Sequence, residues 1–188
     1  RGVGGRAALK IPPALRPGDL VAVAAPASAF DRAAFRRGAE FIAAHGYRVA
    51  YREDIVGRSG SFAGDDERRA AELNGWIRDP EVRAILMARG GWGCARIADR
   101  IDWRALARRP KAVAGFSDLT MLLLGVTQRA GLAAFHGPMV ASAGKQPGGL
   151  RDLDRLLALL AGNPTALAHR GLRALRPGHA RAPLAGGN

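Results

Sequence analysis

Residues 111–130 read KAVAGFSDLTMLLLGVTQRA, and they carry the clearest structural signal in the sequence. The apolar run at 112–116 is typical of a buried parallel strand. It breaks at 115–118, and a helical spacing of apolar residues follows at once, from Leu119 to Val126. The stretch therefore predicts a strand, a tight turn and a helix. The hydroxyl of Ser117 would then lie at the carboxyl edge of a sheet, facing the unpaired N–H groups of a helix.

The turn at Ser117 allows three interpretations. It has the context of a nucleophile elbow, in which the N–H after the serine also binds an oxyanion. The hydrolase pattern G-x-S-x-G is only half met, because Leu119 stands where the second glycine belongs. Serine or aspartate before a helix is also an ordinary N-cap. The third interpretation is a site for an anion at the helix N-terminus, and the turn alone leaves all three open.

The composition indicates an ordinary globular chain with an unusual charge. The 188 residues carry a formal net charge of +13, which comes from 26 arginines and three lysines against 16 acidic residues. The arginines are spread through nearly every segment, and aromatic residues make up only 6% of the chain. Nucleic-acid binding would require clustered basic residues with interleaved aromatics. The sequence therefore argues against a nucleic-acid partner.

Cysteine usage and the apolar runs bear on the compartment. A single cysteine, Cys94, excludes an intramolecular disulfide and is typical of a reducing compartment. The basic start of the sequence, which does not begin with methionine, leads into Ile11-Pro12-Pro13 and not into the apolar core of a signal peptide. No apolar run approaches the length of a membrane span. We expect a soluble, cytoplasmic protein without a membrane partner.

Strand and helix patterns alternate along the chain without an internal repeat. Strands are predicted at 20–25, 47–51, 82–88, 112–116 and 132–135, and helices at 31–44, 65–77, 94–100, after 103, from 119 and at 150–160, with a loop at 143–149. This alternation predicts a three-layer, doubly wound α/β fold of the flavodoxin or Rossmann kind, with a mainly parallel sheet. Residues 1–10 are expected to be a flexible basic tail, 11–164 the α/β domain and 165–188 a linker.

Four loops are expected at the carboxyl edge of this sheet, at 26–28, 90–93, 115–118 and 136–138. The glycine turn at 90–93 lacks the spacing of a dinucleotide fingerprint, but it could present a backbone N–H to an oxyanion or a phosphate. His136 could be a base for Ser117 or a structural histidine. His45, His169 and His179 have no visible partner in the sequence. No cluster has metal-ligand spacing, so neither a metal nor a cofactor is expected.

The chain resembles the N-terminal domain of the LD-carboxypeptidase and microcin-immunity family of serine peptidases. The resemblance rests on an ordered series of short segments, each weak by itself: 15–19 (LRPGD) with Ala25-Pro26, 63–69 (AGDDERR) with Leu73-Asn74, 88–93 (ARGGWG) with Arg96, 101–103 (IDW), 110–111 (PK), 115–120 (GFSDLT), 136–139 (HGPM) and 183–188 (PLAGGN).

The resemblance implies roles for residues in the four loops at the carboxyl edge of the sheet, which we call the rim. Ser117 would be the nucleophile, and the oxyanion would be bound by the N–H of Asp118 and by that of Gly91 or Trp92. The family's glutamate and histidine come from a C-terminal domain after the G-G-N segment, so we expect them outside this chain, which by itself would be nearly inactive. His136 matches a pocket position. The substrate-binding residues would be Gly90, Trp92, Gly93, Phe116, His136 and Ser28.

The substrate that the resemblance implies is a murein tetrapeptide, whose terminal D-alanine is released from the L-centre of a diamino acid during cell-wall recycling. The alternative within the family is hydrolysis of a peptidyl or acyl adenylate in antibiotic self-immunity. Outside the family, the alternative is a non-catalytic module in which the turns at 90–93 and at Ser117 bind an anion. The expected protein partners are the C-terminal domain and a second copy in a homodimer.

Overall fold

The computed structural model describes residues 8–168, 173, 175 and 178–179. Five strands form one sheet in the order β2-β1-β3-β4-β5, and every neighbouring pair is parallel. The strands are β1 (Leu20–Ala24), β2 (Arg48–Ala50), β3 (Val82–Met87), β4 (Ala112–Gly115) and β5 (Phe135–His136). The predicted doubly wound parallel sheet is confirmed, and its strand order is the flavodoxin-like one.

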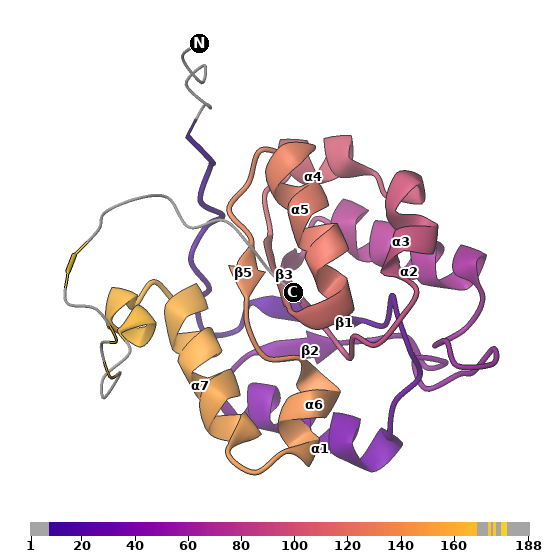
Figure 1. Ribbon diagram of the computed structural model, residues 1–188, viewed down its shortest axis with the longest axis horizontal. Coiled ribbons are helices and arrows are strands. Elements are labelled where there is room, and N and C mark those ends of the chain that lie inside the picture. The colour runs from indigo at the N-terminus through magenta and orange to yellow at the C-terminus, as the bar shows by residue number, and fades with distance from the viewer. Residues whose placement is uncertain (1–7, 169–172, 174, 176–177, 180–188) are drawn as a thin grey trace.

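Helices cover both faces of the sheet (Figure 1). One face carries α1 (Arg32–Ala44), α6 (Val140–Lys145) and α7 (Gly149–Leu160). The other carries α2 (Asp66–Arg78), α3 (Cys94–Ile97), α4 (Trp103–Arg108) and α5 (Thr120–Gln128). Short 3-10 turns complete the chain at η1 (Ala98–Arg100), η2 (Ser117–Leu119) and η3 (Pro164–Leu167). None of the described helices is long and apolar enough to cross a membrane.

The three central strands, β1, β3 and β4, bury side chains on both faces, which explains their mainly apolar sequences. Successive residues alternate between two cores, as the period of a strand requires. The core under α2–α5 contains Ala22, Ala24, Ile85, Met87 and Val113. The core under α1, α6 and α7 contains Val21, Val23, Ala84, Leu86, Ala112 and Ala114.

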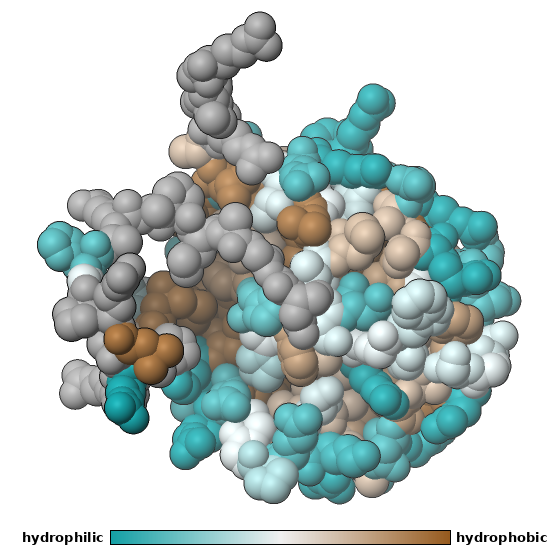
Figure 2. Space-filling model, viewed as in Figure 1, coloured by the Kyte–Doolittle hydropathy of each residue, from teal (hydrophilic) through white to brown (hydrophobic). Residues whose placement is uncertain are grey.

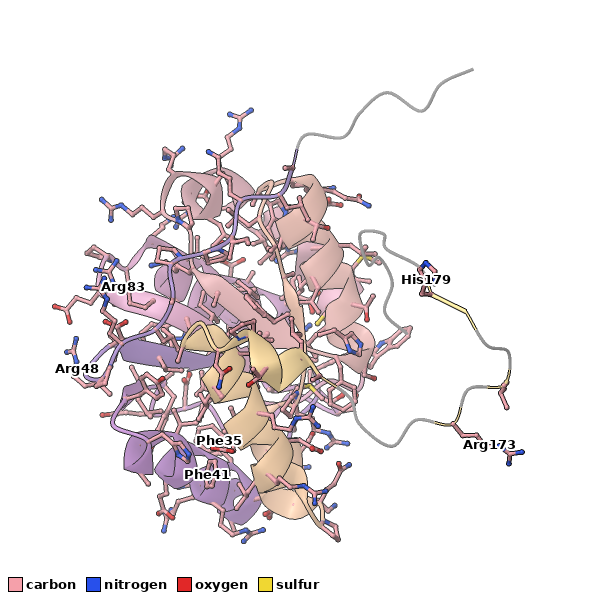
Figure 3. The ribbon with its side chains drawn as sticks, turned by 90° about the vertical axis from the view of Figure 1, so that its left-hand side faces the viewer. Phe35, Phe41, Arg48, Arg83, Arg173 and His179 are labelled. Carbon is pink, nitrogen blue, oxygen red and sulfur yellow. The ribbon has the colours of Figure 1, made fainter. Side chains whose placement is uncertain are left out.

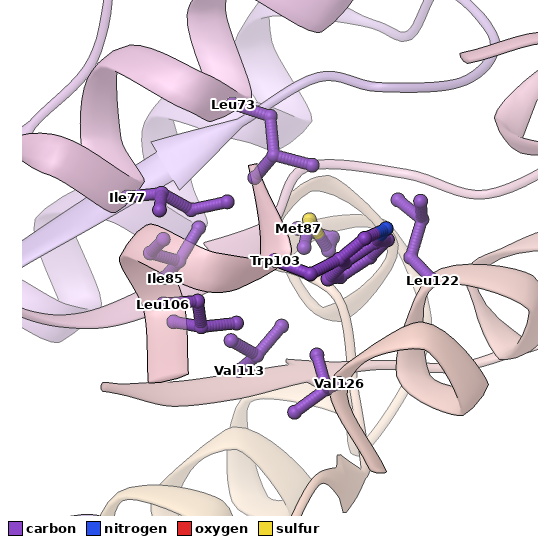
Figure 4. A pocket seen from close by; sticks show the side chains of 9 residues that line it. All are labelled: Leu73, Ile77, Ile85, Met87, Trp103, Leu106, Val113, Leu122 and Val126. Carbon is purple, nitrogen blue, oxygen red and sulfur yellow. The ribbon is translucent and has the colours of Figure 1, made fainter. Parts of the chain in front are cut away.

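The core beneath α2, α4 and α5 leaves a small apolar pocket of about 10 Å³ (Figure 4). Its lining is wholly hydrophobic and includes Trp103 and Met87. A space of this size is at the lower limit for one water molecule, and it offers no polar partner. The pocket is therefore a packing gap and not a candidate site.

Helix α6 was not predicted, and the expected loop at 143–149 is wrong over its first three residues, because α6 extends to Lys145. The segment VASAGK consists mainly of small residues, which give a weak helical signal by themselves. Small residues are needed here because α6 packs closely against α1. A Cβ on Gly144 would collide with Ala34 O, and one on Gly38 would collide with Val140 O. Helices α1 and α6 thus touch backbone to backbone, and this contact stabilises α6.

The edge at β5 also differs from expectation. The predicted strand at 132–135 is reduced to the pair Phe135–His136, and Leu132 instead forms a parallel bridge with Lys10. Lys10, the last residue of the expected tail, thus pairs with the segment before β5, while residues 1–7 lie outside the described part of the chain. Most of the expected linker at 165–188 also lies outside it and stays a prediction. Figure 2 shows apolar residues gathered beside β5 and α7, with hydrophilic residues over most of the same face.

The remaining element ends follow their sequence signals. Asp31 and Asp65 cap α1 and α2, each accepting a backbone N–H at 2.7 Å. Arginines project from many elements, as the even spread of charge predicted; Arg48 and Arg83, near the amino ends of β2 and β3, lie on the same side of the molecule (Figure 3). The positive charge of the described chain is therefore distributed over several elements.

Candidate active site

Ser117 stands at the turn between β4 and α5, where the sequence placed it. Its φ is +63°, and it is the only non-glycine residue with positive φ in the described part of the chain. Such a conformation costs on the order of 1–3 kcal/mol and is concentrated at functional sites. An N-cap residue has an extended backbone instead, and that position is taken by Phe116, with φ −151°. The geometry of Ser117 is therefore that of a strained elbow and not of a helix cap.

Asp118 follows Ser117 in the first turn of η2. Its backbone N–H belongs to the start of a helix, where such groups lack intrahelical acceptors. Its side chain turns toward the neighbouring loop, and Oδ2 accepts the Cys94 N–H at 2.9 Å. Asp118 thus connects the serine turn with the glycine turn that follows β3.

The glycine turn at 90–93 lies directly against the serine turn. A Cβ on Gly90 would come within 3.3 Å of both Ser117 Cβ and Phe116 O, so the two turns lie closely against each other. Gly91 has φ +102° and Gly93 has φ +122°. The turn therefore requires glycine both for its conformation and for its contacts.

Ser28, in the loop after β1, holds the glycine turn from its other side. Its N–H donates to Gly90 O at 3.2 Å, and its Oγ accepts the Trp92 N–H at 3.1 Å. The Trp92 N–H is thus already engaged, whereas the Gly91 N–H has no hydrogen-bond partner among the described residues. Of the two donors that the sequence left open, Gly91 is therefore the one whose N–H is unpaired within the described part of the chain.

These loops meet at the topological switch point of the sheet. β1 and β3 are neighbours, but the chain leaves them toward opposite sides of the sheet, so the loops after their carboxyl ends diverge. In doubly wound folds this is the place where ligands bind. The loop at 26–28 follows β1, the glycine turn follows β3, and the Ser117 turn follows β4. The structure therefore brings Ser28, the glycine turn, Ser117 and Asp118 together at one rim.

Arg69 lies beneath this rim and was not recognised from the sequence as a site residue. It is fully buried, and its Nη1 donates to Pro26 O at 2.5 Å and to Gly93 O at 3.0 Å. Nη2 pairs with Asp66, and the guanidinium lies 4.8 Å from the ring centre of Phe62. One buried cation thus joins the loop after β1 to the loop after β3.

A second buried ionisable group, Glu72, lies under the end of β1. Its Oε2 accepts the Ala25 N–H at 2.8 Å and pairs with Arg68 Nη1 at 2.9 Å. Burial raises the pKa of this carboxyl group, and the charge of Arg68 opposes that rise. The hydrogen bond to Ala25 fixes the backbone immediately before the Pro26 turn.

Cys94 is not a competing nucleophile. Its thiol is buried, and burial together with the nearby Asp118 carboxylate raises its pKa far above the usual value. A thiol that stays protonated is inert, because the thiolate is the reactive form. The described residues also contain no group of three or more His, Cys, Asp or Glu side chains arranged to hold a metal ion.

His136 lies at the same rim, at the end of β5. It pairs in register with Gly115, and the next N–H, that of Gly137, donates to Gly115 O at 3.1 Å. The imidazole is exposed, and its ring centre lies 6.1 Å from that of Phe116. Trp92 is also exposed, with 67% of its surface accessible. His136, Phe116 and Trp92 thus add exposed or half-buried rings to the rim.

His45 has a partner that the sequence did not reveal. Its Nε2 lies 3.0 Å from Asp154 Oδ1, and Nδ1 lies 2.8 Å from Phe41 O. This histidine–carboxylate pair stands at the far end of α1, which leads from the carboxyl end of β1 to the amino end of β2. It is therefore at the edge of the sheet opposite Ser117.

The chain has recognisable relatives. Residues 21–137 match the family model described as the LD-carboxypeptidase N-terminal domain. The chain is 40% identical over 131 residues to a probable murein peptide carboxypeptidase of Bacillus subtilis, which covers 70% of this chain and 41% of that protein. It is 33% identical over 150 residues to a murein tetrapeptide carboxypeptidase of Pseudomonas aeruginosa, covering 79% of this chain and 48% of that one.

Solved structures agree with the fold. The microcin C7 self-immunity protein MccF in complex with aspartyl sulfamoyl adenosine aligns with a TM-score of 0.72 at 26% identity, over 81% of this chain and 46% of that one. The chain thus spans about half the length of the proteins it matches.

Proposed function

Because this chain belongs to the LD-carboxypeptidase family, we propose that it forms the nucleophile-bearing part of a serine carboxypeptidase that releases the terminal D-alanine of a murein tetrapeptide. The observation that carries the proposal is the strained Ser117, with φ +63°, packed against the glycine turn at the switch point of the sheet. The reaction would belong to cell-wall recycling in the cytoplasm.

In the proposed mechanism, Ser117 Oγ attacks the carbonyl carbon that joins the L-centre of the diamino acid to D-alanine. The serine proton passes to a base and then to the leaving amine, so that the peptide bond breaks as the ester to Ser117 forms. Water then hydrolyses this ester and returns the proton to the serine. The tetrahedral oxyanion in each step would lie between the Asp118 N–H and the Gly91 N–H.

The base and its orienting acid are assigned to residues that this chain does not contain. The family's glutamate and histidine follow the segment that ends here as Gly186-Gly187-Asn188, and the matched relatives are about twice as long. His136 is proposed as a pocket residue, with Phe116 and Trp92 as an aromatic wall for the substrate. Gly90, Gly93 and Ser28 would shape the pocket and hold the glycine turn.

A second substrate class is supported by the likeness to MccF, which was solved with aspartyl sulfamoyl adenosine. Hydrolysis of an acyl adenylate uses the same acyl transfer to serine, and only the leaving group differs. The same site could therefore act on an aminoacyl nucleotide in self-immunity. A non-catalytic anion-binding module is the alternative from another class.

The experiment compares both substrates on the longest natural form of the protein that carries this chain. D-Alanine release from murein tetrapeptide and cleavage of aspartyl sulfamoyl adenosine are measured by mass spectrometry. Ser117→Ala is the test variant, and Ser142→Ala, on α6, is the matched control. We expect D-alanine release that is lost in the first variant and kept in the second.

Three other outcomes have defined meanings. Release that persists in Ser117→Ala removes this serine as the nucleophile. Cleavage of the adenosine conjugate alone favours the second substrate class. Binding of either compound without turnover favours the non-catalytic module.

A further inference from the structure

Asp118 has two polar ends that face different parts of the rim. Its backbone N–H is one proposed oxyanion donor, and its carboxylate accepts the Cys94 N–H at 2.9 Å. Cys94 begins α3 immediately after Gly93, three residues beyond the other proposed donor, Gly91. One residue therefore supplies the first donor and contacts the loop that supplies the second.

Among the described residues, backbone groups of 90–94 make four hydrogen bonds to other loops and helices, besides the local bond from the Arg96 N–H to Gly93 O, and these four divide by partner. Gly90 O and the Trp92 N–H bond to Ser28, and Gly93 O bonds to Arg69. These three fix the turn to the loop after β1 and to α2. The fourth, from the Cys94 N–H to Asp118, joins the turn to the loop that carries Ser117.

We propose that the Asp118 carboxylate is a positioning residue, which sets the distance between the two oxyanion donors through its hydrogen bond to the Cys94 N–H. This inference rests on the function proposed above. The bond is charge-assisted, which makes it shorter and stronger than one between neutral groups. It acts across two loops that leave neighbouring strands, β3 and β4, beyond the last registered pair of their ladder, Leu86 with Ala114.

The expected effect is confined to the transition state. An oxyanion forms only there, so a displaced donor lowers kcat and leaves KM nearly unchanged. Loss of one donor in other hydrolases lowers kcat by about 10²–10³, and a displacement of about 1 Å can cost about 10². For Asp118→Ala, which keeps both backbone N–H groups, we expect kcat to fall by about 10–100-fold.

Asp118→Asn is the conservative variant. Its amide oxygen can still accept the Cys94 N–H, so we expect kcat within about five-fold of the parent enzyme, because a neutral acceptor is weaker than a charged one but keeps the geometry. The matched control is Asp102→Ala. Asp102 Oδ1 accepts the Ala105 N–H, also at 2.9 Å, at the start of α4 and outside the rim.

The kinetic test uses the longest natural form of the protein, with kcat normalised to folded protein. A purely structural role for Asp118 predicts that Asp118→Ala and Asp102→Ala lower the melting temperature and leave the normalised kcat unchanged. The positioning role predicts a fall in kcat in Asp118→Ala alone, with recovery in Asp118→Asn. Equal kcat in Asp118→Ala and the parent, or an Asn variant as impaired as the Ala variant, overturns the inference.

A second measurement separates this inference from the proposed function. In the 188-residue chain, amide hydrogen exchange of Gly91 and Cys94 is followed by NMR in the parent, Asp118→Asn and Asp118→Ala. We expect Cys94 to exchange at least ten-fold faster in Asp118→Ala and the Gly91 resonance to shift. Unchanged exchange and an unmoved Gly91 resonance contradict the inference even where turnover is normal, whereas an inactive parent with altered exchange contradicts only the proposed function.

Discussion

Arg69 and Gly93 fit each other at the base of the rim: Arg69 Nη1 donates to Gly93 O at 3.0 Å, and a Cβ on Gly93 would lie 2.6 Å from that same nitrogen. Glycine at this position therefore makes room for the buried guanidinium, and the guanidinium in turn binds the glycine's carbonyl. The same nitrogen also reaches Pro26 O, so the arrangement joins the loops on both sides of the switch point.

The first prediction concerns Arg69. In Arg69→Met the carbonyls of Pro26 and Gly93 lose a buried donor, and Asp66 loses one of its two cations. We expect the free energy of unfolding to fall by about 2–4 kcal/mol, measured by urea denaturation. Arg37→Met is the control, because Arg37 is exposed and donates to a single carbonyl, that of Gly144; a change within about 0.5 kcal/mol is expected there. Equal losses in the two variants would contradict the prediction.

The role of Arg69 could not be predicted from the sequence. In the segment DDERRAAEL, Asp66 and Arg69 stand three residues apart, which is typical of an ion pair on the exposed face of a helix. Only the tertiary structure places that face under two loops from other strands. The same holds for α6, whose small residues show their function only against α1.

The strands and the Ser117 turn, by contrast, follow from local signals. The runs at 84–87 and 112–115 are apolar and buried on both faces, and the change from strand to helical spacing marks the turn at Ser117. Such local signals do not predict the positive φ of Ser117, because a serine before a helix is more often an N-cap with an extended backbone. The choice between Gly91 and Trp92 also required the structure, since it depends on Ser28, more than 60 residues away.

The second prediction concerns Gly91. The backbone at Gly91 has φ +102°, which residues with a side chain rarely adopt, and an added Cβ would lie 2.5 Å from Ser28 Oγ. Gly91→Ala should therefore move the proposed donor and lower kcat for D-alanine release by about 10–100-fold. Gly75→Ala is the matched control: it lies within α2 with nothing within 4 Å of the added Cβ, and it should stabilise the helix by about 0.5–1 kcal/mol. A Gly91→Ala variant as active as the parent would remove Gly91 from the oxyanion site.

The third prediction concerns acid stability. The side-chain hydrogen bond from Arg96 lowers the pKa of Asp66, and the charges of Arg96 and Arg69 act in the same direction. The folded state therefore holds the Asp66 proton less tightly than the unfolded state, whose aspartate pKa is about 3.9. The stabilisation is present above that value and is lost as the pH falls below it toward the folded pKa.

Melting temperatures between about pH 6 and pH 2.5 test this linkage. The parent should have a higher melting temperature than Asp66→Asn at pH 6, and the two melting temperatures should converge as the pH falls below about 4. Glu67→Gln is the control. Glu67 is also in the first turn of α2, but it is largely exposed, and its Oε2 lies 3.4 Å from Nη1 of the exposed Arg100. A constant difference between the parent and Asp66→Asn across the whole range would show that this carboxylate does not contribute through its ionisation.

The last prediction concerns the 188-residue chain alone. It carries the proposed nucleophile and both oxyanion donors, but its described histidine–carboxylate pair, His45 with Asp154, stands at the opposite edge of the sheet. A serine hydroxyl without a base is a poor nucleophile at neutral pH. In a well-studied serine protease, loss of the histidine lowers kcat by about 10⁶-fold. The remaining rate is still about 10³-fold above the uncatalysed rate, because the oxyanion site and substrate binding are kept. We expect the same order of loss here, measured as D-alanine release from murein tetrapeptide.

The matched variants for this measurement are Ser117→Ala and His136→Ala. The weak turnover of the parent chain should be little changed by His136→Ala beyond an effect on KM, because His136 is assigned to the pocket. Adding the C-terminal domain of a relative in trans should raise turnover where it docks, and Ser117→Ala should then abolish the gain. Robust turnover by the chain alone that disappears in His136→Ala would instead make His136 the base. Its place beside Gly115 at the rim would then be the geometry that serves Ser117, and no second domain would be needed for the chemistry.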